Sequence, residues 1–524
     1  MPEKVNKVRV NKVRMISTLL LALTVLTAGA QQRIAQQRIP CVRNIPTDVS
    51  KTRGILGYPA TDWDSEKIYR QAVILISFSD QDFSMDDPAA YYNRVLNEPG
   101  YNEGYGAGCA ADYFRDQSNG LFNLQFDVYG PFKVSEKVKG GNNNYGDSAM
   151  EEALEQLKAA TDADFSVYDW DGDGQVNQMV FIAAGFTGNQ MKGYIWPNTY
   201  YSYFKAPGDI HIGMASISCE MWKDSTPCGI GTICHEFAHC LGLPDIYPTG
   251  SSSFSVVDEW DLMDGGNYTN KGWCPPNFSA TERMLLGWMT PTELTEPTTI
   301  TGMKPLSEGG ETFIIRNSGN ADEYYMLEHR RQTKWDYGIP GEGLAIFHVD
   351  FDREMWSNNQ VNSSDSHYHY DLFHADGKDY RDWDPGNDGK DMGKYSKDDW
   401  MRNRYLSTSP YPYYDEELDI TNLLLTNYSY PAATLFHENT DGRKYMSKPV
   451  TEIRMSDDGT ISFDFMKDPV SSLQTPDSFS PSLLTPVAYY DLYGRRLKSP
   501  EDHGICIIRY SDGTIRKHQY ELSQ

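Results

Sequence analysis

Cysteine is scarce in this chain, with only 8 among 524 residues. Exported proteins that depend on disulfides for their scaffold carry a higher share, so we exclude a disulfide-built fold. Cys219 and Cys228 lie near enough in sequence to pair across a loop, but spacing alone does not fix a pairing. Cys41, in the N-terminal segment, is a candidate cap on a metal, with an ordinary structural residue as the alternative.

Basic residues are also few, because 47 Lys and Arg face 73 Asp and Glu, which gives a formal net charge of −26. A nucleic-acid partner needs clustered Lys and Arg to neutralise phosphates, so this composition excludes that class of function. Acidic surface loops are instead a common source of calcium sites, and they also serve solubility.

Long apolar runs are absent as well, except for a short one at residues 15–30, MISTLLLALTVLTAGA. A basic segment precedes it and Ala28-Gly29-Ala30 ends it, which is typical of a secretory signal peptide cleaved before Gln31. The run is too short for a comfortable transmembrane helix, and no later stretch is long enough. The sequence therefore predicts an exported protein with no transmembrane segment.

The length predicts more than one domain, and 39% hydrophobic residues suffice for sizeable cores. Buried-strand patterns at 68–80 and 175–185, a half-buried strand at 121–130 and amphipathic helices at 108–120 and 148–162 indicate an α/β (α+β) domain. Short strands between Gly, Pro and Asn turns follow it. We expect a signal peptide at 1–30, a lead-in or short propeptide at 31–66, a catalytic domain at 67–290, a β-rich domain at 291–466, a linker at 467–486 and a small β-module at 487–524.

The stretch CHEFAHCLGLPDIY at 234–247 places two histidines four residues apart on a predicted helix. His235 and His239 then project from one face, at the spacing of two nitrogen ligands to one zinc ion. Glu236 lies beside them, where its carboxylate can take a proton from a zinc-activated water. Gly242 permits a sharp turn, after which Asp245 offers a third ligand. The alternative is a buried helix with two hydrogen-bonded histidines, and we interpret Cys234 and Cys240 as small core residues.

A second segment, VVDEWDLMDGGNYT, supports a zinc site. It holds Met263 in a glycine-flanked turn, and metzincin proteases use such a turn as an apolar floor under the metal. Tyr268 follows and is a candidate hydrogen-bond donor to the oxyanion of the reaction, or else an ordinary loop aromatic.

HEFAHCLGLPDIY, WDLMDGG and PPNFSATERMLLGW together resemble the M6 family of secreted metallopeptidases, the immune inhibitor A group. VILISFSDQDF, ADYFRDQSNGLF and YYMLEHRRQTKWDYGIPGEGLAIFHVD extend the resemblance over roughly residues 67–466. It implies a zincin catalytic domain followed by a β-rich domain. It also implies that His235 and His239 bind zinc, that Glu236 is the general base and that Met263 forms the Met-turn. Asp245 matches the family's aspartate, and Glu282 is the alternative third ligand.

Two further clusters could hold metal. Asp169, Asp171 and Asp173 alternate in YDWDGDGQVNQ as in an EF-hand loop, so we predict a structural calcium ion there. The EF-hand glutamate is replaced by Val180, so any further ligand comes from elsewhere, and a plain Asp-rich turn is the alternative. His367 and His369 form an HxH pair, for which the nearby sequence offers no third ligand. His348 is expected to be a structural strand residue.

YDLYGRR and GICIIRYSDGTIRK resemble the C-terminal sorting domains of type IX secretion cargo, which implies export and possible attachment to the outer-membrane surface. The function predicted from all these features is a secreted zinc endopeptidase that acts on protein or peptide substrates. Two alternatives are a non-catalytic surface adhesin on a degenerate protease fold, and a zinc hydrolase of cell-wall or glycan-linked substrates, because zinc-water chemistry serves all these bonds.

Overall fold

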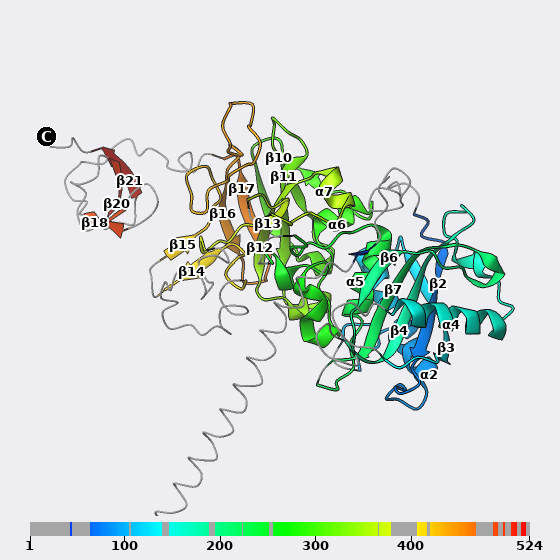
Figure 1. Cartoon of the computed structure of the whole chain (residues 1–524). Helices are drawn as coiled ribbons and strands as arrows, with labels where there is room; N and C mark the ends of the chain where they lie inside the picture. Colours follow the sequence, from blue (N-terminus) through cyan, green and yellow to red (C-terminus); the bar gives the residue numbers. More distant parts are fainter. Residues whose placement is uncertain are drawn as a thin grey trace, which may run out of the picture.

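The computed structural model describes most of the chain from residue 63 to residue 467, together with five short stretches outside it (Figure 1). The described residues are 42–43, 63–103, 106–138, 146–187, 194–222, 224–250, 255–364, 366–378, 406–416, 420–467, 486–490, 496–497, 505–510 and 515–519. The predicted signal peptide, Cys41 and most of the predicted linker lie outside these ranges.

A 7-stranded mixed sheet forms the first half of the fold, with the order β1-β6-β7-β4-β2-β3 and with β5 paired to β4. Neighbouring strands pair in parallel except for β6 and β7, so β1 and β6 run opposite to the other five strands. The strands are β1 Val42–Arg43, β2 Ile68–Ser77, β3 Asn123–Lys133, β4 Val176–Thr187, β5 Tyr194–Ile195, β6 Asn198–Tyr201 and β7 Ile212–Met221.

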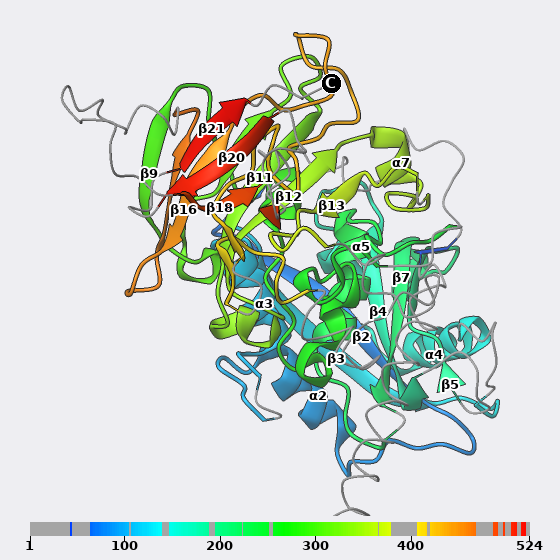
Figure 2. The ribbon, with the colours of Figure 1, turned by 90° about the vertical axis from the view of Figure 1, so that its left-hand side faces the viewer.

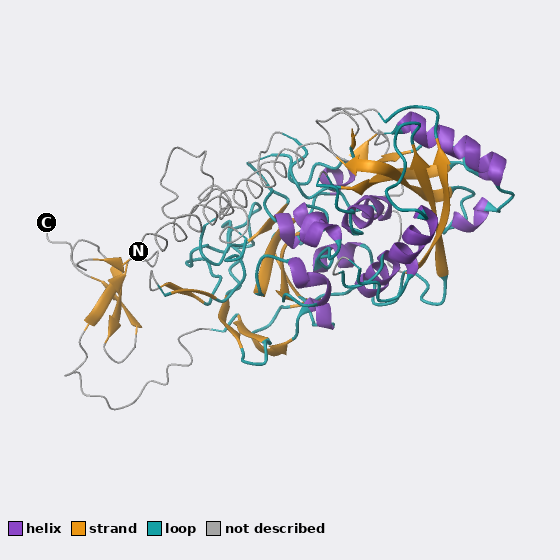
Figure 3. Cartoon of the chain, turned by 90° about the horizontal axis from the view of Figure 1, so that it is seen from below, coloured by secondary structure: helices purple, strands orange, loops and turns teal. Residues whose placement is uncertain are grey.

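Helices cover both faces of this sheet (Figures 1 and 3). Successive side chains of β2 point to opposite faces, as the strand geometry requires. Ala72, Ile74 and Ile76 pack in the cluster that includes α4, whereas Val73 and Leu75 pack with α3 and α5. The α-helices are α2 Pro88–Asn97, α3 Ala110–Gln117, α4 Asp147–Ala160, α5 Gly231–Leu241, α6 Ala280–Leu285 and α7 Arg353–Ser357. Short 3-10 turns are η2 Phe165–Tyr168, η3 Pro207–Asp209, η4 Asp258–Trp260, η5 Gly265–Gly272, η6 Leu306–Glu308 and η7 Lys334–Gly338.

Among the regular elements that the structure describes after residue 291, strands outnumber helices, and long loops connect them. A 5-stranded sheet has the order β13-β12-β11-β10-β8, and smaller sheets are β16-β17-β9 and β14-β15. The strands are β8 Thr292–Glu293, β9 Thr298–Met303, β10 Phe313–Arg316, β11 Glu323–Arg330, β12 Gly343–Asp350, β13 Tyr370–Leu372, β14 Tyr413–Asp415, β15 Ile420–Asn422, β16 Val450–Met455 and β17 Ile461–Phe465.

The C-terminal segment forms a 4-stranded antiparallel sheet of its own, with the order β19-β18-β20-β21. Its strands are β18 Pro486–Tyr490, β19 Arg496–Leu497, β20 Ile505–Tyr510 and β21 Ile515–Gln519. The strand-and-turn pattern predicted for the tail is therefore present. Among the helices that the structure describes, we find none with the length and apolar character that a membrane crossing requires.

One hydrophobic core joins the α/β part to the 5-stranded sheet. Phe237 of α5 and Met263 belong to the same buried cluster as Met326 of β11 and Phe347 of β12. Figure 2 shows α5 between the strands β4 and β7 and the sheet of β11, β12 and β13. The two predicted domains therefore meet over the helix that carries the histidine pair.

Seven cysteines of the described chain are free and buried, including Cys219 and Cys228. The disulfide that we considered between those two is absent here. Cys234 and Cys240 are buried in α5, as expected of small core residues.

Candidate metal centre and active site

The helix α5 holds both histidines at the centre of the molecule. Every residue of Gly231–Leu241 is buried, and the helix ends at Gly242, whose φ of 104° favours glycine. Gly231 is equally constrained, because a Cβ atom there would lie 2.1 Å from the carbonyl oxygen of Asn267. Gly231 lets the chain pack closely against the start of the helix, and Gly242 turns the chain after the helix back toward Asp245.

The imidazole rings are oriented by main-chain carbonyls. His235 Nδ1 lies 2.8 Å from Leu262 O, and His239 Nδ1 lies 2.7 Å from Leu243 O. A carbonyl oxygen only accepts hydrogen bonds, so each Nδ1 carries the proton and each Nε2 keeps a lone pair. In metal-binding histidines the nitrogen that does not bind the metal usually donates to such a carbonyl, and this contact fixes the orientation of the ring.

Asp245 completes a group of three potential ligands. Its Oδ1 atom lies 3.3 Å from Nε2 of His235 and 3.3 Å from Nε2 of His239. Lone pairs at this separation repel one another unless a cation or a proton lies between them. A tetrahedral zinc ion with bonds of about 2.0–2.1 Å separates its ligand atoms by about 3.3–3.4 Å. The three atoms therefore fit zinc in both chemistry and spacing.

The second oxygen of Asp245 is held from the opposite side of the fold. Asn359 Nδ2 donates to Asp245 Oδ2 at 2.6 Å, and the Asp245 main-chain N–H donates to Asn359 Oδ1 at 2.6 Å. Burial alone would raise the pKa of this fully buried carboxyl, but the nearby imidazoles lower it well below its usual range. Asp245 is therefore an oriented carboxylate with one oxygen facing the histidines.

Glu236 points into a pocket beside the histidines. Thr199 of β6 donates its hydroxyl to Glu236 Oε2 at 2.7 Å and also lies 2.9 Å from the main-chain oxygen of Glu236. His235, Glu236 and Tyr268 line the same pocket, with Trp196 and Thr232 nearby. A carboxylate and a phenol thus flank one space next to the three candidate ligands.

Several polar atoms of this pocket lack a protein partner. Trp196 Nε1, Thr232 Oγ1 and Asn267 Oδ1 are buried and make no hydrogen bond to any residue that the structure describes. Buried polar atoms are costly without a partner, so such atoms in a pocket indicate a polar ligand or ordered water.

Met263, the predicted Met-turn residue, lies in a buried turn that is hydrogen-bonded to the segment after α5. Its side chain is fully buried, and its carbonyl accepts a hydrogen bond from Ile246 N at 2.8 Å. The preceding carbonyl, of Leu262, is the one that orients His235. The turn therefore touches the helix motif both through its apolar side chain and through its main chain.

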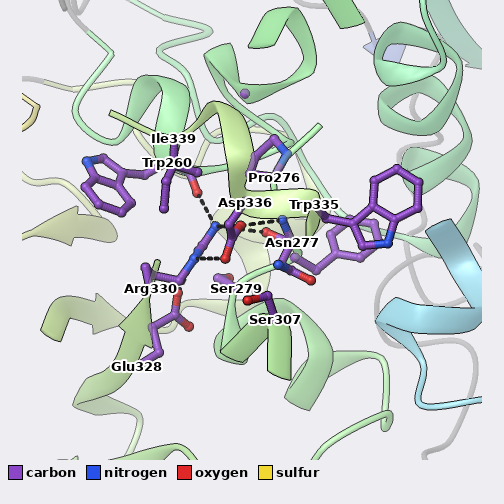
Figure 4. A network of polar contacts seen from close by, with 12 residues as sticks. Trp260, Pro276, Asn277, Ser279, Ser307, Glu328, Arg330, Trp335, Asp336 and Ile339 are labelled. Atoms are coloured by element: carbon purple, nitrogen blue, oxygen red, sulfur yellow. Dashed lines mark hydrogen bonds and ion pairs between the residues drawn. The ribbon is translucent and has the colours of Figure 1, made fainter. Parts of the chain in front are cut away.

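Arg330, a buried arginine of β11, is hydrogen-bonded to the segment just before this turn (Figure 4). Arg330 binds Asp336 Oδ1 at 2.7 Å and Glu328 Oε1 at 2.8 Å, and it donates to Trp260 O at 3.3 Å. Asp336 also accepts the Asn277 N–H at 2.9 Å. The charges are thus paired, and the network joins the β-rich part to the segment that begins three residues before Met263.

Glu282, the alternative third ligand, has a different partner. Its Oε2 atom accepts the Ser279 N–H at 2.7 Å, in a capping box at the start of α6. Burial raises its pKa well above the usual range, and the charge of Asp261 adds to this. Within the described chain the histidines are grouped with Asp245, and Glu282 is not among them.

The acidic loop brings Asp169, Asp171 and Asp173 together, with carboxylate oxygens within 4.8 Å of one another. However, Asp169 already accepts main-chain N–H groups from Gly172 and Gly174 at 2.8 and 2.7 Å. Val180 lies within β4, buried against the sheet, and contributes no ligand. The geometry is that of an Asp-rich turn, and calcium there stays a prediction.

The expectation for the HxH pair is wrong in one respect, because a third candidate ligand does lie near it. Asp350, at the end of β12, places Oδ2 2.7 Å from His367 Nε2. It is 17 residues away in sequence, and the pairing of β12 with β13 brings it close. His348 is a strand residue of β12, as expected, and it contacts Glu323.

Three residues of the site are not evident from sequence. Thr199 and Asn359 are separated from their partners by 37 and 114 residues, and no local pattern marks either of them. Trp196 stands in a short segment between β5 and β6 without periodicity. Only the tertiary structure places Trp196 in the pocket, Thr199 beside Glu236 and Asn359 beside Asp245.

Residues 212–287, which include both histidines, Glu236, Asp245 and Met263, match the family described as immune inhibitor A peptidase M6, catalytic domain. The pre-pro-metalloprotease PrtV of Vibrio cholerae serotype O1 (strain M66-2) is 21% identical over 276 residues, which is 44% of this chain and 29% of the relative. Immune inhibitor A of Bacillus thuringiensis subsp. alesti is 24% identical over 238 residues, 38% of this chain and 35% of the relative.

The chain thus spans about a third of the length of these curated relatives. The family match nevertheless covers the segment in which the candidate ligands, the acidic neighbour and the methionine floor are assembled. These matches show that the segment carrying the candidate site is similar to the catalytic domain of M6 metallopeptidases.

Proposed function

We propose that this protein is an exported zinc-dependent endopeptidase that hydrolyses peptide bonds of extracellular proteins. His235, His239 and Asp245 hold the zinc ion, and Glu236 is the general base. The observation that carries the proposal is the convergence of two Nε2 lone pairs and one carboxylate oxygen at 3.3 Å, next to the Glu236 carboxylate.

A zinc ion held there would lower the pKa of a water molecule and polarise the scissile carbonyl. Glu236 takes the proton from the attacking water and passes it to the leaving amine. The Thr199 hydroxyl at 2.7 Å keeps the Glu236 carboxylate in one orientation during this transfer. Since that hydroxyl donates to the ionised form, it favours the base as a carboxylate before the water is activated.

Tyr268 and the polar atoms around it bind the substrate. The Tyr268 hydroxyl donates to the oxyanion that forms on the scissile carbonyl, where a preorganised donor is most effective. Trp196 Nε1 and Asn267 Oδ1 have no partner in the described chain. The indole N–H suits a peptide C=O of the substrate, and the amide oxygen suits a peptide N–H. Peptide main chain is the substrate chemistry that offers both groups at every residue.

The wider organisation follows the same family. We infer a zincin layout in which the mixed sheet backs the helix α5, and a β-rich second domain over 291–466. Export rests on the signal-peptide pattern of residues 1–30, and surface attachment rests on the sorting-like sequence of residues 487–524. A calcium ion at Asp169, Asp171 and Asp173 is part of the proposal, and a rise in melting temperature on adding calcium, absent in Asp171→Asn, tests it.

The reaction class is tested by a side-by-side substrate assay. Purified protein is stripped with a chelator, reloaded with zinc and incubated with casein and with isolated cell-wall material. We expect casein cleavage that is lost with the metal and restored by zinc. Release of cell-wall fragments without casein cleavage would favour the hydrolase alternative. The adhesin alternative predicts loss of Glu236 or of a histidine, and all of these residues are present.

A further inference from the structure

A second group of metal-binding side chains lies in the β-rich part, away from α5. Asp350 Oδ2 is approached by three imidazoles: His367 Nε2 at 2.7 Å, His437 Nε2 at 3.2 Å and His369 Nδ1 at 3.9 Å. Asp350, His367 and His369 place ligand atoms within 4.8 Å of one another. Three histidines gathered on one buried carboxylate form a donor set that the peptidase reaction does not use.

The strand pairing explains how these residues meet. Asp350 ends β12, and its main-chain N–H donates to His369 O at 3.0 Å, just before β13 begins. His367 and His369 are two residues apart in an extended segment, so their rings lie on one side and stack with centroids 4.2 Å apart. The β12–β13 ladder therefore supplies three of the four side chains.

The fourth side chain, His437, is brought in by a buried glutamate. Glu323 starts β11, directly opposite Asp350 in the sheet. Its carboxylate accepts the main-chain N–H groups of Phe436 and His437 at 2.5 and 3.0 Å, and it also binds His348 Nε2 at 2.8 Å. These hydrogen bonds hold residues 436–437 against the sheet at Glu323. They bring His437 next to Asp350, although 87 residues separate the two in sequence.

The protonation pattern also suits a metal. His369 Nδ1 lies 2.8 Å from the main-chain oxygen of Asp350 and is also the atom 3.9 Å from Asp350 Oδ2, so Nδ1 carries the proton and the ring offers Nε2 to a cation. This histidine-to-carbonyl bond is the usual outer contact of a metal-ligating histidine. The Asp350 side chain is only 4% exposed, whereas that of His437 is 49% exposed, so the site has an anchored floor and an open side for entry.

We propose that Asp350, His367, His369 and His437 form a second metal site, for a divalent transition-metal ion such as zinc. Three imidazoles and one carboxylate are the donors that zinc prefers, whereas calcium takes oxygen ligands. The three separations from Asp350 Oδ2, 2.7, 3.2 and 3.9 Å, lie on both sides of the 3.3 Å found at His235 and His239, so metal binding requires small shifts of the His367 and His369 rings. The ion ties β12, β13 and the 436–437 segment together and stabilises the β-rich part without taking part in the reaction.

The test separates this ion from the one at α5. A full-length His235→Ala/His239→Ala variant removes the first site, and its zinc content is measured after stripping and equilibration with zinc. We expect it to retain one zinc per chain. Adding His367→Ala and His437→Ala should bring the content close to zero, whereas adding His211→Ala should not. His211 is the matched control, because it is an exposed histidine that contacts Gln175.

A single His437→Gln substitution at the half-exposed position guards against misfolding, and far-UV circular dichroism checks each variant. In the otherwise native chain, His437→Gln should lower the zinc affinity of the second site at least about tenfold, in the range usual for loss of an ordering contact at a metal. The proposal would be overturned if folded His437→Gln and His367→Ala/His437→Ala proteins bound zinc as well as the wild type. Absence of zinc from the His235→Ala/His239→Ala variant would also overturn it.

Discussion

Asp245 and Asn359 are joined by two hydrogen bonds of 2.6 Å each. The Asp245 main-chain N–H donates to Asn359 Oδ1, and Asn359 Nδ2 donates to Asp245 Oδ2. Both side chains are buried, and 114 residues separate them in sequence. Asp245 follows the histidine helix, whereas Asn359 follows α7 in the β-rich part. The carboxylate that faces the histidines is thus aimed by a residue of the other half of the molecule.

Asn359→Ala should therefore weaken zinc binding at the active site. Loss of an outer contact to a metal ligand costs about 10–100-fold in metal affinity or activity. The measurement is zinc affinity by competition with a chromogenic chelator, together with the rate of casein cleavage at saturating zinc. Gln360→Ala is the neighbouring control, because that side chain is exposed. Equal zinc affinity in the two variants would contradict a role for Asn359 in orienting Asp245.

Thr199→Val should slow catalysis and leave zinc content unchanged. The variant keeps the volume of the side chain but removes the hydroxyl that donates to Glu236 Oε2 at 2.7 Å. A hydrogen bond to a charged group contributes about 1.5–3 kcal/mol, so we expect kcat/KM to fall about 10–100-fold. The acid limb of the pH–rate profile should move to higher pH, because the ionised base loses a donor. Thr199→Ser should restore most of the rate, and failure to do so would point to packing alone.

Tyr268→Phe tests the oxyanion donor. The substitution removes one hydroxyl from the pocket shared with His235 and Glu236. Removal of such a donor costs about 10²–10³ in kcat, because the contact forms mainly in the transition state. KM should change little by comparison. Tyr337→Phe, at an exposed tyrosine, is the control. A Tyr268→Phe enzyme with native kcat would assign the oxyanion to another group.

Much of the first sheet and of the site was predictable from sequence. The strands at 68–80 and 175–185 and the helix motif carry strong periodic or spacing signals, and they correspond to β2, β4 and α5. The central strand β7 carries no such signal, because Ser216, Ser218 and Glu220 interrupt its apolar pattern although all three are buried. The fold supplies partners for Glu220, whose carboxylate accepts the Ser84 and Gly185 N–H groups.

The remaining site contacts could not be predicted because they depend on tertiary pairing. Asn359 meets Asp245 only when the β-rich part packs on α5, and Asp350 meets His367 only when β12 pairs with β13. The sequence favours Asp245 as the third ligand and leaves Glu282 as the alternative. A capping box at Ser279 gives Glu282 a local partner, which leaves Asp245 as the carboxylate beside the histidines.

Glu282→Gln should preserve zinc and change the pH dependence of stability. Burial and the charge of Asp261 raise the pKa of Glu282 well above its ordinary value of 4.5. Above pH 4.5 the unfolded chain releases a proton that the folded chain retains, so the wild type loses stability as pH rises toward the elevated pKa. Glutamine still accepts in the capping box but does not ionise. The variant should gain about 1–3 kcal/mol over wild type at pH 8, and less at pH 5.

Urea unfolding at the two pH values measures this difference, and metal analysis of the same samples measures zinc. A Glu282→Gln protein with native zinc content and a pH-dependent gain in stability fits a structural role. Loss of zinc in a folded variant would instead indicate that Glu282 is the third ligand and that Asp245 does not bind the ion directly.

The most direct test of the whole account compares wild type with Glu236→Ala in zinc content and in casein cleavage. Glu236 is not among the three grouped ligands, so both proteins should hold the same amount of zinc at the active site. Only the wild type should cleave casein, because the variant lacks the base that takes the proton from water. Equal cleavage by both zinc-loaded proteins, or a wild type that holds no zinc, would contradict the proposed mechanism.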